Sequence, residues 1–224
     1  MIPWVELGKT SVPGGGEMRL MRRGQEFSIR LGVKELMNSR LSGSEEALAT
    51  LACARIAGVA RPRVLIGGLG MGFTLRAALG ALPAEAEIEV AEIVPAVAQW
   101  AKTEMAAIFA GSLGDPRVRV ELEDVAQIIG AARARYDAIL LDVDNGPEGM
   151  TREANDGLYA ARGLAAARAA LRPGGVLAVW SVAPDRRFTQ RLRQAGFATE
   201  EVVSRARGAR GGARHIIWLA TRPR

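Results

Sequence analysis

The amino-acid sequence predicts an α/β fold, in which a doubly wound and mostly parallel sheet of seven strands follows a small β appendage. Three observations predict it. From Arg63 onward, short apolar runs alternate with helical patterns. The first run, 64–67, leads directly into the spaced glycines Gly68, Gly70 and Gly72, as a parallel strand does when it turns into a helix through bare backbone. The last two apolar runs have no helix between them, which favours an antiparallel hairpin at the end of the sheet.

Residues 1–43 are expected to form the β appendage, because they lack helical periodicity. Short stretches typical of strands lie at 4–9, 17–22 and 26–33. The glycine run after Pro13 is typical of a turn. A helix is then expected over 44–58, with Ser44 as its N-cap. The chain is therefore divided into an appendage, 1–43, and a main domain, 44–224.

The main domain is expected to alternate strands and helices. Strands are predicted at 63–67, 88–93, 118–122, 136–143 and 175–181. Helices are predicted at about 72–80, 95–109, 124–133, 153–171 and 185–195. Two last strands, 197–205 and 215–221, are joined by a connection rich in arginine and glycine. That connection is expected to be a solvated hairpin loop.

Length and composition are those of a soluble globular protein. The chain has 224 residues, of which 49% are hydrophobic and 24% charged. No apolar run approaches the roughly 20 residues that span a bilayer, and the N-terminus has no basic stretch followed by an apolar one. A cytoplasmic protein without membrane contact is expected.

The rare residue types exclude some chemistries. Cys53 is the one cysteine, so no internal disulfide can form, and its alanine-rich surroundings favour a small core residue. His215 is the one histidine, which argues against a Ser-His-Asp triad or a histidine-rich metal site and favours a structural role. No metal is expected. The net charge of +6 permits binding to nucleic acid but does not require it, because arginine is abundant throughout the chain.

Candidate site residues gather after the predicted parallel strands, where open α/β sheets bind ligands. Gly68, Gly70 and Gly72 follow the first strand, and Glu92, with Ile93 after it, ends the second. The carboxylate of Glu92 is placed to accept both hydroxyls of a ribose. Further acids follow the third and fourth strands: Glu123, Asp124, Asp142 and Asp144.

The acids after the third and fourth strands also have structural alternatives. Asp124 either caps the following helix or accepts the exocyclic amine of an adenine, and both interpretations carry equal weight. Asp142 and Asp144 either stabilise a tight turn around Asn145 or orient and deprotonate an amine or hydroxyl nucleophile. Catalysis is favoured for Asp142 and less firmly for Asp144.

These motifs resemble the spermidine/spermine synthase family of the class I S-adenosylmethionine-dependent methyltransferase fold. The segment 65–76 is similar to that family's glycine loop and the Leu-Arg after it. Segment 91–97 resembles its Val-Glu-Ile-Asp-Pro-x-Val, and 115–118 and 136–142 also match. The resemblance covers 63–181 well and extends plausibly over 17–58. It implies a homodimer and a small-molecule substrate, such as an amine.

Residue by residue, the resemblance makes Glu92 the ribose acid, Asp124 the adenine contact and Asp142 the acid that receives the acceptor amine. The chain also departs from the family. Met71 stands where the family has an aspartate that reads the donor's amine. Asn145 takes the place of the second aspartate of the Asp-x-x-Asp loop, although Asp144 is adjacent. Other departures fall near Asn38, Ala47 and Leu48, where the family has a glutamine and a Tyr-His pair.

Three functions compete on this basis. The first is a transferase with S-adenosylmethionine or its decarboxylated form as donor. Loss of the amine-reading residues modestly favours methyl transfer over aminopropyl transfer, while Asp142 keeps the latter open. The second is a non-catalytic nucleoside-binding or dimeric module. A nicotinamide-dependent oxidoreductase is weaker, because the spacing of Gly68, Gly70 and Gly72 is G-x-G-x-G rather than G-x-G-x-x-G.

Overall fold

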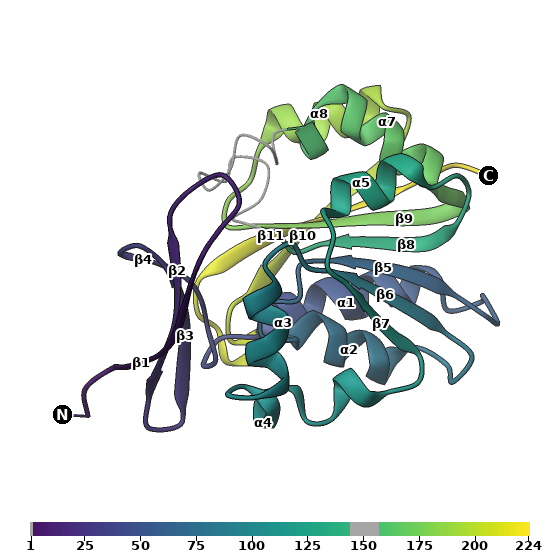
Figure 1. Cartoon of the computed structure of the whole chain (residues 1–224). Helices are drawn as coiled ribbons and strands as arrows, with labels where there is room; N and C mark the ends of the chain where they lie inside the picture. The colour runs from purple at the N-terminus through teal and green to yellow at the C-terminus, as the bar shows by residue number, and fades with distance from the viewer. Residues whose placement is uncertain (1, 144–156) are drawn as a thin grey trace.

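Two sheets organise the protein (Figure 1). The computed structural model describes residues 2–143 and 157–224. A four-stranded antiparallel sheet in the order β1-β2-β3-β4 comes first along the chain. A seven-stranded sheet follows, in the order β10-β11-β9-β8-β5-β6-β7. The predicted fold class is confirmed, including its seven strands, its antiparallel C-terminal hairpin and its separate N-terminal sheet.

The N-terminal sheet is a meander of short strands. Its strands are β1 (Val5–Ser11), β2 (Glu17–Arg23), β3 (Glu26–Leu31) and β4 (Lys34–Asn38). The prediction of a single strand over 26–33 was wrong at its end, and β4 was missed. Gly32, at φ +57°, turns the chain back on itself after β3, and a β3–β4 hairpin results.

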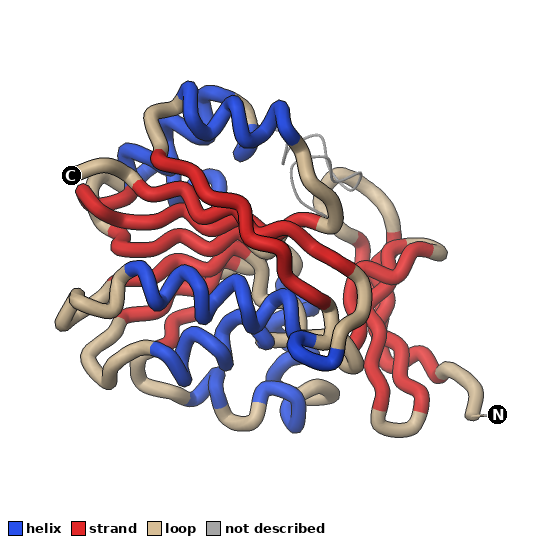
Figure 2. The backbone as a smooth tube through the Cα atoms, turned by 180° about the vertical axis from the view of Figure 1, so that it is seen from behind, coloured by secondary structure: helices blue, strands red, loops and turns tan. Residues whose placement is uncertain are grey.

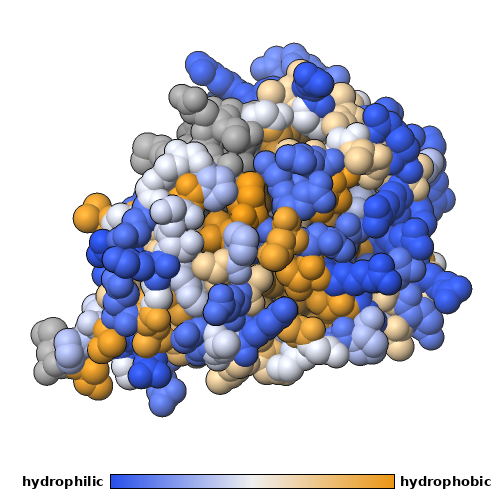
Figure 3. Space-filling view, in the orientation of Figure 1, coloured by the Kyte–Doolittle hydropathy of each residue, from blue (hydrophilic) through white to orange (hydrophobic). Residues whose placement is uncertain are grey.

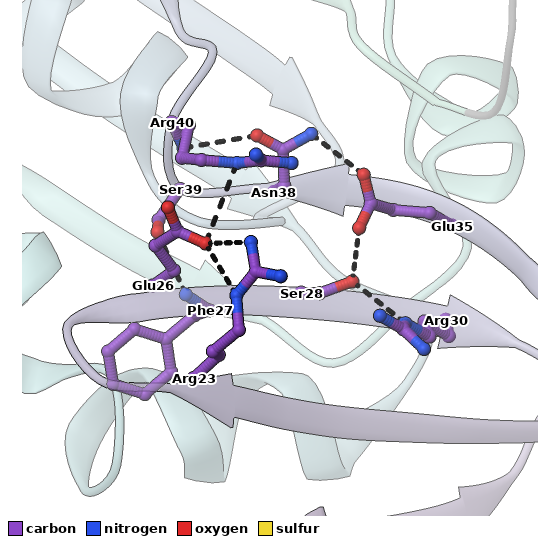
Figure 4. Close-up of polar contacts among 9 residues, drawn as sticks. All are labelled: Arg23, Glu26, Phe27, Ser28, Arg30, Glu35, Asn38, Ser39 and Arg40. Atoms are coloured by element: carbon purple, nitrogen blue, oxygen red, sulfur yellow. Dashed lines mark hydrogen bonds and ion pairs between the residues drawn. The ribbon is translucent and has the colours of Figure 1, made fainter. Parts of the chain in front are cut away.

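Polar side chains tie the β3–β4 hairpin together on one side (Figure 4). Ser28 on β3 donates to Glu35 on β4 at 2.6 Å, and Asn38 donates to the other oxygen of Glu35 at 2.9 Å. Nearby, Glu26 accepts a 2.7 Å bond from Arg23. These contacts pair the polar side chains with one another on one face of the sheet. The apolar side chains lie on the other face.

The main sheet changes direction of winding at its centre. The parallel strands are β5 (Arg63–Gly67), β6 (Glu87–Ala91), β7 (Val118–Glu121), β8 (Tyr136–Leu141) and β9 (Leu171–Ser181). Strand β5 pairs with β6 on one side and with β8 on the other. The strand order reverses there, so the topological switch point lies between β5 and β8. The antiparallel pair β10 (Ala198–Arg205) and β11 (Arg214–Thr221) closes the sheet beside β9.

Helices cover both faces of this sheet (Figures 1 and 2). One face carries α1 (Gly43–Arg55), α2 (Phe73–Ala81), α3 (Pro95–Lys102) and α4 (Ala106–Phe109). The other face carries α5 (Val125–Ala131), α7 (Ala161–Ala170) and α8 (Arg186–Gln194). Short 3₁₀ turns occupy Ser112–Gly114 and Gly208–Arg210. In the described part of the chain, no helix is long and apolar enough to cross a membrane.

Strand β8 shows how the sheet separates two cores. All six of its residues are buried. Ala138 and Leu140 point into the core beneath α1 and α2, whereas Ile139 and Leu141 point into the core beneath α5 and α7. Near-continuous apolar runs therefore mark strands that are covered on both sides. The buried, unpaired Cys53 belongs to the first core, as expected, and burial raises the pKa of its thiol to about 11.

Some helix boundaries differ from the predictions. The expected helix over 95–109 ends at Lys102 and resumes at Ala106, because the chain turns inward at the fully buried Met105. Strand β9 starts at Leu171 instead of 175, since Leu171 already pairs with Tyr136 of β8. The N-cap of α1 is Ser42, so the prediction of Ser44 at that position was wrong.

Candidate active site

A cavity of about 190 Å³ lies where the N-terminal sheet meets the carboxyl ends of the main parallel strands. The main domain contributes the glycine loop, the ends of β6 and β8, and the chain after β7. The N-terminal sheet contributes an apolar wall: Val12, Met18, Ile29, Leu31, Leu36 and Met37. Figure 3 shows apolar surface in the band where the two parts meet. Most of the predicted site residues therefore share one cavity.

The glycine loop approaches its neighbours too closely for side chains. At Gly68, with φ +90°, a Cβ would lie 2.7 Å from the carbonyl oxygen of Asp142. Both Gly68 and Gly70 line the cavity. Gly72 is not among the lining residues, and a Cβ there would meet the ring of Phe109 at 2.4 Å. In this structure Gly72 makes room for packing, while the other two make room at the cavity.

Glu92 anchors the loop through its carboxylate. The side chain is 7% exposed, and its two oxygens accept backbone N–H bonds from Leu69 at 3.1 Å and Val94 at 2.8 Å. Burial raises the pKa of Glu92, and these backbone bonds oppose that rise. Each carboxylate oxygen has a second lone pair. Glu92 and its neighbour Ile93 line the cavity, so a ligand could be held by the same group that fixes the loop.

Asp124 fulfils the first of its two predicted roles. It is the N-cap of α5, and its Oδ1 accepts the N–H of Ala126 at 2.8 Å. Asp124 also lines the cavity, as does its neighbour Glu123. Capping occupies one oxygen, so the second oxygen is open to a ligand.

Asp142 lies immediately after β8, beside the glycine loop. Its Oδ2 accepts a 2.7 Å bond from the hydroxyl of Thr74 on α2, and its backbone N–H donates to Gly67 at 3.0 Å. Burial raises the pKa of Asp142 to about 6, and the Thr74 bond opposes the rise. Asp144 lies outside the described residues.

Glu45 is a cavity residue that the sequence did not indicate. It lies in the first turn of α1 and lines the cavity with Asp142. Burial, and then the charge of Asp142, raises the pKa of Glu45 to about 7. The hydroxyl of Thr74, which donates to Asp142, also lies 3.4 Å from the backbone oxygen of Glu45. The structure thus brings together two acids that are remote in sequence.

A short chain of polar contacts continues from Glu45 to the beginning of β11. The hydroxyl of Ser44 donates to Glu45 Oε2 at 2.7 Å, and His215 Nδ1 lies 2.9 Å from that hydroxyl oxygen. The His215 ring packs against Trp180, which also lines the cavity, with 4.8 Å between ring centroids. Ser44 is buried and lies inside α1, one residue after its start, so it is not placed to be the N-cap.

No metal centre is evident among residues 2–143 and 157–224. In that part of the protein, no three His, Cys, Asp or Glu side chains are grouped so that they could hold an ion. The polar side chains that line the cavity are five carboxyls and the indole N–H of Trp180, namely Glu45, Glu92, Glu123, Asp124, Asp142 and Trp180. Such groups can bind an uncharged ribose and base and can accept protons from an amine.

No protein-family model matches the chain. Its curated relatives include a polyamine aminopropyltransferase of Mycobacterium tuberculosis (strain ATCC 25618 / H37Rv), which is 33% identical over 144 residues. This match covers 60% of the chain but 27% of the relative. Another relative, putrescine N-methyltransferase 2 of Nicotiana attenuata, is 36% identical over 116 residues, which are 51% of this chain and 29% of the relative.

Solved structures cover more of the chain. A spermidine synthase from Thermotoga maritima superposes with a TM-score of 0.76 at 16% identity, over 96% of this chain and 72% of that one. A probable spermidine synthase from Corynebacterium glutamicum gives a TM-score of 0.65 at 16% identity, over 96% and 79% of the two chains. At these identities the superpositions establish the class I methyltransferase-like fold, including the N-terminal sheet.

Proposed function

We propose that this chain, a spermidine-synthase-like protein, is a transferase that moves a group from an S-adenosylmethionine-type donor to an amine. One observation carries the proposal: Gly68, Gly70 and Glu92 share a single cavity with the two acids Glu45 and Asp142. The first three suit a nucleoside, and the acids suit a cationic amine that must lose a proton before it can attack.

Aminopropyl transfer from decarboxylated S-adenosylmethionine is the proposed reaction. Taken alone, the sequence departures at Met71 and Asn145 favour methyl transfer, because they remove acids that the related family uses. Two other observations outweigh them. Glu45 supplies a carboxyl from a different element, in the cavity itself. A buried ammonium group needs such a partner. The relatives named polyamine aminopropyltransferase support the same choice.

The apolar wall suits the remainder of an alkyl amine. Met18, Ile29 and Leu31 line the cavity from the N-terminal sheet. Methylene groups of an acceptor gain about 0.8 kcal/mol each when they are fully buried against such a wall. A small amine with a hydrocarbon chain is therefore the proposed acceptor.

In the proposed reaction, Asp142 takes a proton from the acceptor ammonium group. The freed nitrogen lone pair forms a bond to the donor carbon, and the bond from that carbon to the sulfonium sulfur breaks. The sulfur keeps the electron pair and leaves as a neutral thioether, methylthioadenosine. Because the sulfonium is already a good leaving group, placement and deprotonation supply the catalysis.

Methyl transfer is the second candidate, and Met71 favours it. A methionine has no carboxylate, and this side chain is fully buried in the core. Position 71 therefore offers no acid to an amine on the donor. The relatives named putrescine N-methyltransferase also support methyl transfer. In this alternative Asp142 keeps the role given above, and Gly68, Gly70 and Glu92 still hold the nucleoside.

Calorimetric titration with S-adenosylmethionine, its decarboxylated form and methylthioadenosine tests the proposal, with NAD as control. Tightest binding of the decarboxylated donor, followed by spermidine formation with putrescine, is expected. Preference for S-adenosylmethionine would select methyl transfer. Binding of none of the three nucleosides would contradict both and leave a non-catalytic module.

Replacement of Asp142 by Asn should abolish turnover while sparing donor binding, because the amide retains the shape but cannot accept the proton. Mass-spectrometric detection of product and calorimetry with methylthioadenosine measure the two effects separately. Turnover at the wild-type rate would make Asp142 structural. A homodimer in the cytoplasm is also proposed, and light scattering tests the oligomeric state.

A further inference from the structure

Most backbone N–H groups of the glycine loop are paired within the main domain. Those of Gly68 and Gly72 donate to backbone carbonyls, each at 2.9 Å. The N–H of Leu69 donates to Glu92 at 3.1 Å, and Gly70 gives a further backbone hydrogen bond to the same carboxylate. Each of these hydrogens is therefore taken by an acceptor of the protein itself.

The N–H of Met71 is covered from the N-terminal sheet. It donates to the thioether sulfur of Met37, on β4, at 3.2 Å. Met37 lines the cavity, whereas Met71 does not. The thioether lies directly on the loop, because a Cβ on Gly70 would be 2.9 Å from Cε and 3.0 Å from the sulfur of Met37. Met37 therefore lies between this N–H and the cavity.

The position that Met37 covers is one that commonly binds anions. The N-terminus of a helix after a glycine loop attracts negative groups through its N–H groups and its dipole. Here α2 begins at Phe73, and both Phe73 and Thr74 are buried and do not line the cavity. The approach from the cavity to this end of α2 is thus occupied by the Met37 side chain.

The side chains around the cavity offer an anion no cation. Arginine, lysine and histidine are absent from the described residues that line it. Its acidic side chains are the acid pair, Glu45 and Asp142, together with Glu92, Glu123 and Asp124. A carboxylate is costly to bury without a cation or donated hydrogen bonds. The cavity therefore disfavours a ligand that carries a carboxylate.

We propose that Met37 selects the donor, by excluding S-adenosylmethionine in favour of its decarboxylated form. The two donors differ by one carboxylate. The Met37 sulfur occupies the N–H that could hold this group, and the acids of the cavity repel it. The decarboxylated donor has no carboxylate and loses nothing when the N–H is covered. The proposal rests on the proposed aminopropyl transfer, to which it adds a residue that determines specificity.

Amide hydrogen exchange tests the contact in the ligand-free protein. Met37→Ala should speed exchange of the Met71 N–H about tenfold or more, because this N–H loses its acceptor. The Gly68 N–H is the internal control, since its carbonyl acceptor is unchanged in the variant. Equal exchange of the Met71 N–H in the two proteins would overturn the proposal.

Calorimetry with the two donors tests the selection itself. The wild-type protein should bind the decarboxylated donor more tightly. In Met37→Ala the ratio of the two affinities should shift about tenfold toward S-adenosylmethionine, because the carboxylate gains an N–H donor. Met37→Lys should shift the ratio further, since it adds a cation. A merely structural change would weaken both donors equally, and an unchanged ratio in both variants would overturn the proposal.

Met21→Ala and Met21→Lys are the matched controls. Met21 lies on β2 of the same sheet and follows the buried Leu20, so it points to the opposite face. It does not line the cavity. Both controls should keep the wild-type ratio. A shift in Met21→Lys as large as that in Met37→Lys would mean that the added charge acts from anywhere on the sheet, against the role of Met37.

The outcomes separate this proposal from the proposed function. If the wild-type protein prefers the decarboxylated donor and forms spermidine, while the ratio is unchanged in the Met37 variants, the transferase stands and Met37 does not select the donor. Preference of the wild type for S-adenosylmethionine would overturn the exclusion and select methyl transfer. Binding of no nucleoside would refute the proposed function, and exchange of the Met71 N–H would still decide whether Met37 covers the loop.

Discussion

At the scale of single residues, the site depends on how each buried carboxyl group is satisfied. Glu92 is held by two backbone N–H groups, and Asp142 by a hydroxyl. One carboxylate oxygen of Asp124 caps the N-terminus of α5. For Glu45, burial and then the charge of Asp142 raise the pKa. The bonds to Glu92 fix the backbone of the glycine loop, whereas the raised pKa values of Glu45 and Asp142 favour retention of a proton on these carboxyls.

Replacement of Glu92 by Ala should weaken methylthioadenosine binding. The variant loses the acceptor for Leu69 and Val94, so the loop loosens, and it also loses the proposed ribose contact. Loss of hydrogen bonds to a charged group costs about 1.5–3 kcal/mol, or roughly 10–100-fold in affinity. Calorimetry measures the change.

The matched control is Glu87→Ala, at the other end of β6, where the side chain is exposed and pairs with Arg63. Its affinity should equal that of the wild type. If Glu92→Ala also bound with unchanged affinity, the ribose role of Glu92 would be excluded.

Stability should fall as pH rises from about 4 toward 7. The pKa values of Glu45 and Asp142 are raised in the folded state, so the folded protein holds protons there that the unfolded chain has released. Their stabilising contribution is complete below the unfolded pKa values and is lost as pH passes the folded ones. Denaturant unfolding across this range measures the slope.

Glu45→Gln should make that slope shallower, by an amount on the order of 2 kcal/mol over the range. Glu85→Gln, at an exposed position just before β6, is the control and should retain the wild-type slope. A wild-type protein whose stability rises over this interval would contradict the inferred burial of the pair.

At the scale of secondary structure, strand ends were the predictable part of the site. Glu92, Asp124 and Asp142 follow parallel strands, and that pattern alone places them at one edge of the sheet. Glu45 was not predictable in this way. It comes from the first turn of α1, whose position depends on tertiary packing against the β10–β11 hairpin.

Gly43 is the point at which α1 meets that hairpin. Its N–H donates to the carbonyl of Ala206 at 3.0 Å, and a Cβ would lie 2.2 Å from the backbone nitrogen of Gly208. Gly43→Ala should therefore displace the first turn of α1, which carries Glu45. We expect a loss of about 1–3 kcal/mol in unfolding free energy, as for overpacked sites.

Thermal or denaturant unfolding measures this loss. Gly58→Ala is the matched control, because nothing lies within 4 Å of a Cβ there. It should be neutral or slightly stabilising. Equal stability of the two variants would mean that α1 tolerates a shift against the hairpin.

At the scale of the whole molecule, alternation of apolar runs was enough to predict the layered main domain. This alternation could not predict that the N-terminal sheet lines the cavity, because no local sequence pattern indicates which surface a strand will cover. The structure shows Leu20 and Ile29 in the same apolar core as α1 and α2. The division of the chain at residue 43 stays a prediction.

The shared core leads us to expect one cooperative unfolding transition. Leu20 is fully buried and Ile29 is 4% exposed, so the N-terminal sheet cannot detach without exposing apolar surface on both sides. Differential scanning calorimetry should give equal calorimetric and van't Hoff enthalpies. Two separated transitions would instead indicate that residues 1–43 unfold alone.

The cavity has walls from two sheets, and this has an evolutionary consequence. Val12, Met18 and Leu31 lie in or next to strands of the N-terminal sheet, and none of them belongs to the glycine loop or the acid pair. Mutations in this wall can reshape one side of the cavity while the opposite side retains its geometry. We therefore expect a lineage with this architecture to change the ligands that this wall accepts by drift within residues 1–43, while the glycine loop and the strand ends keep their geometry.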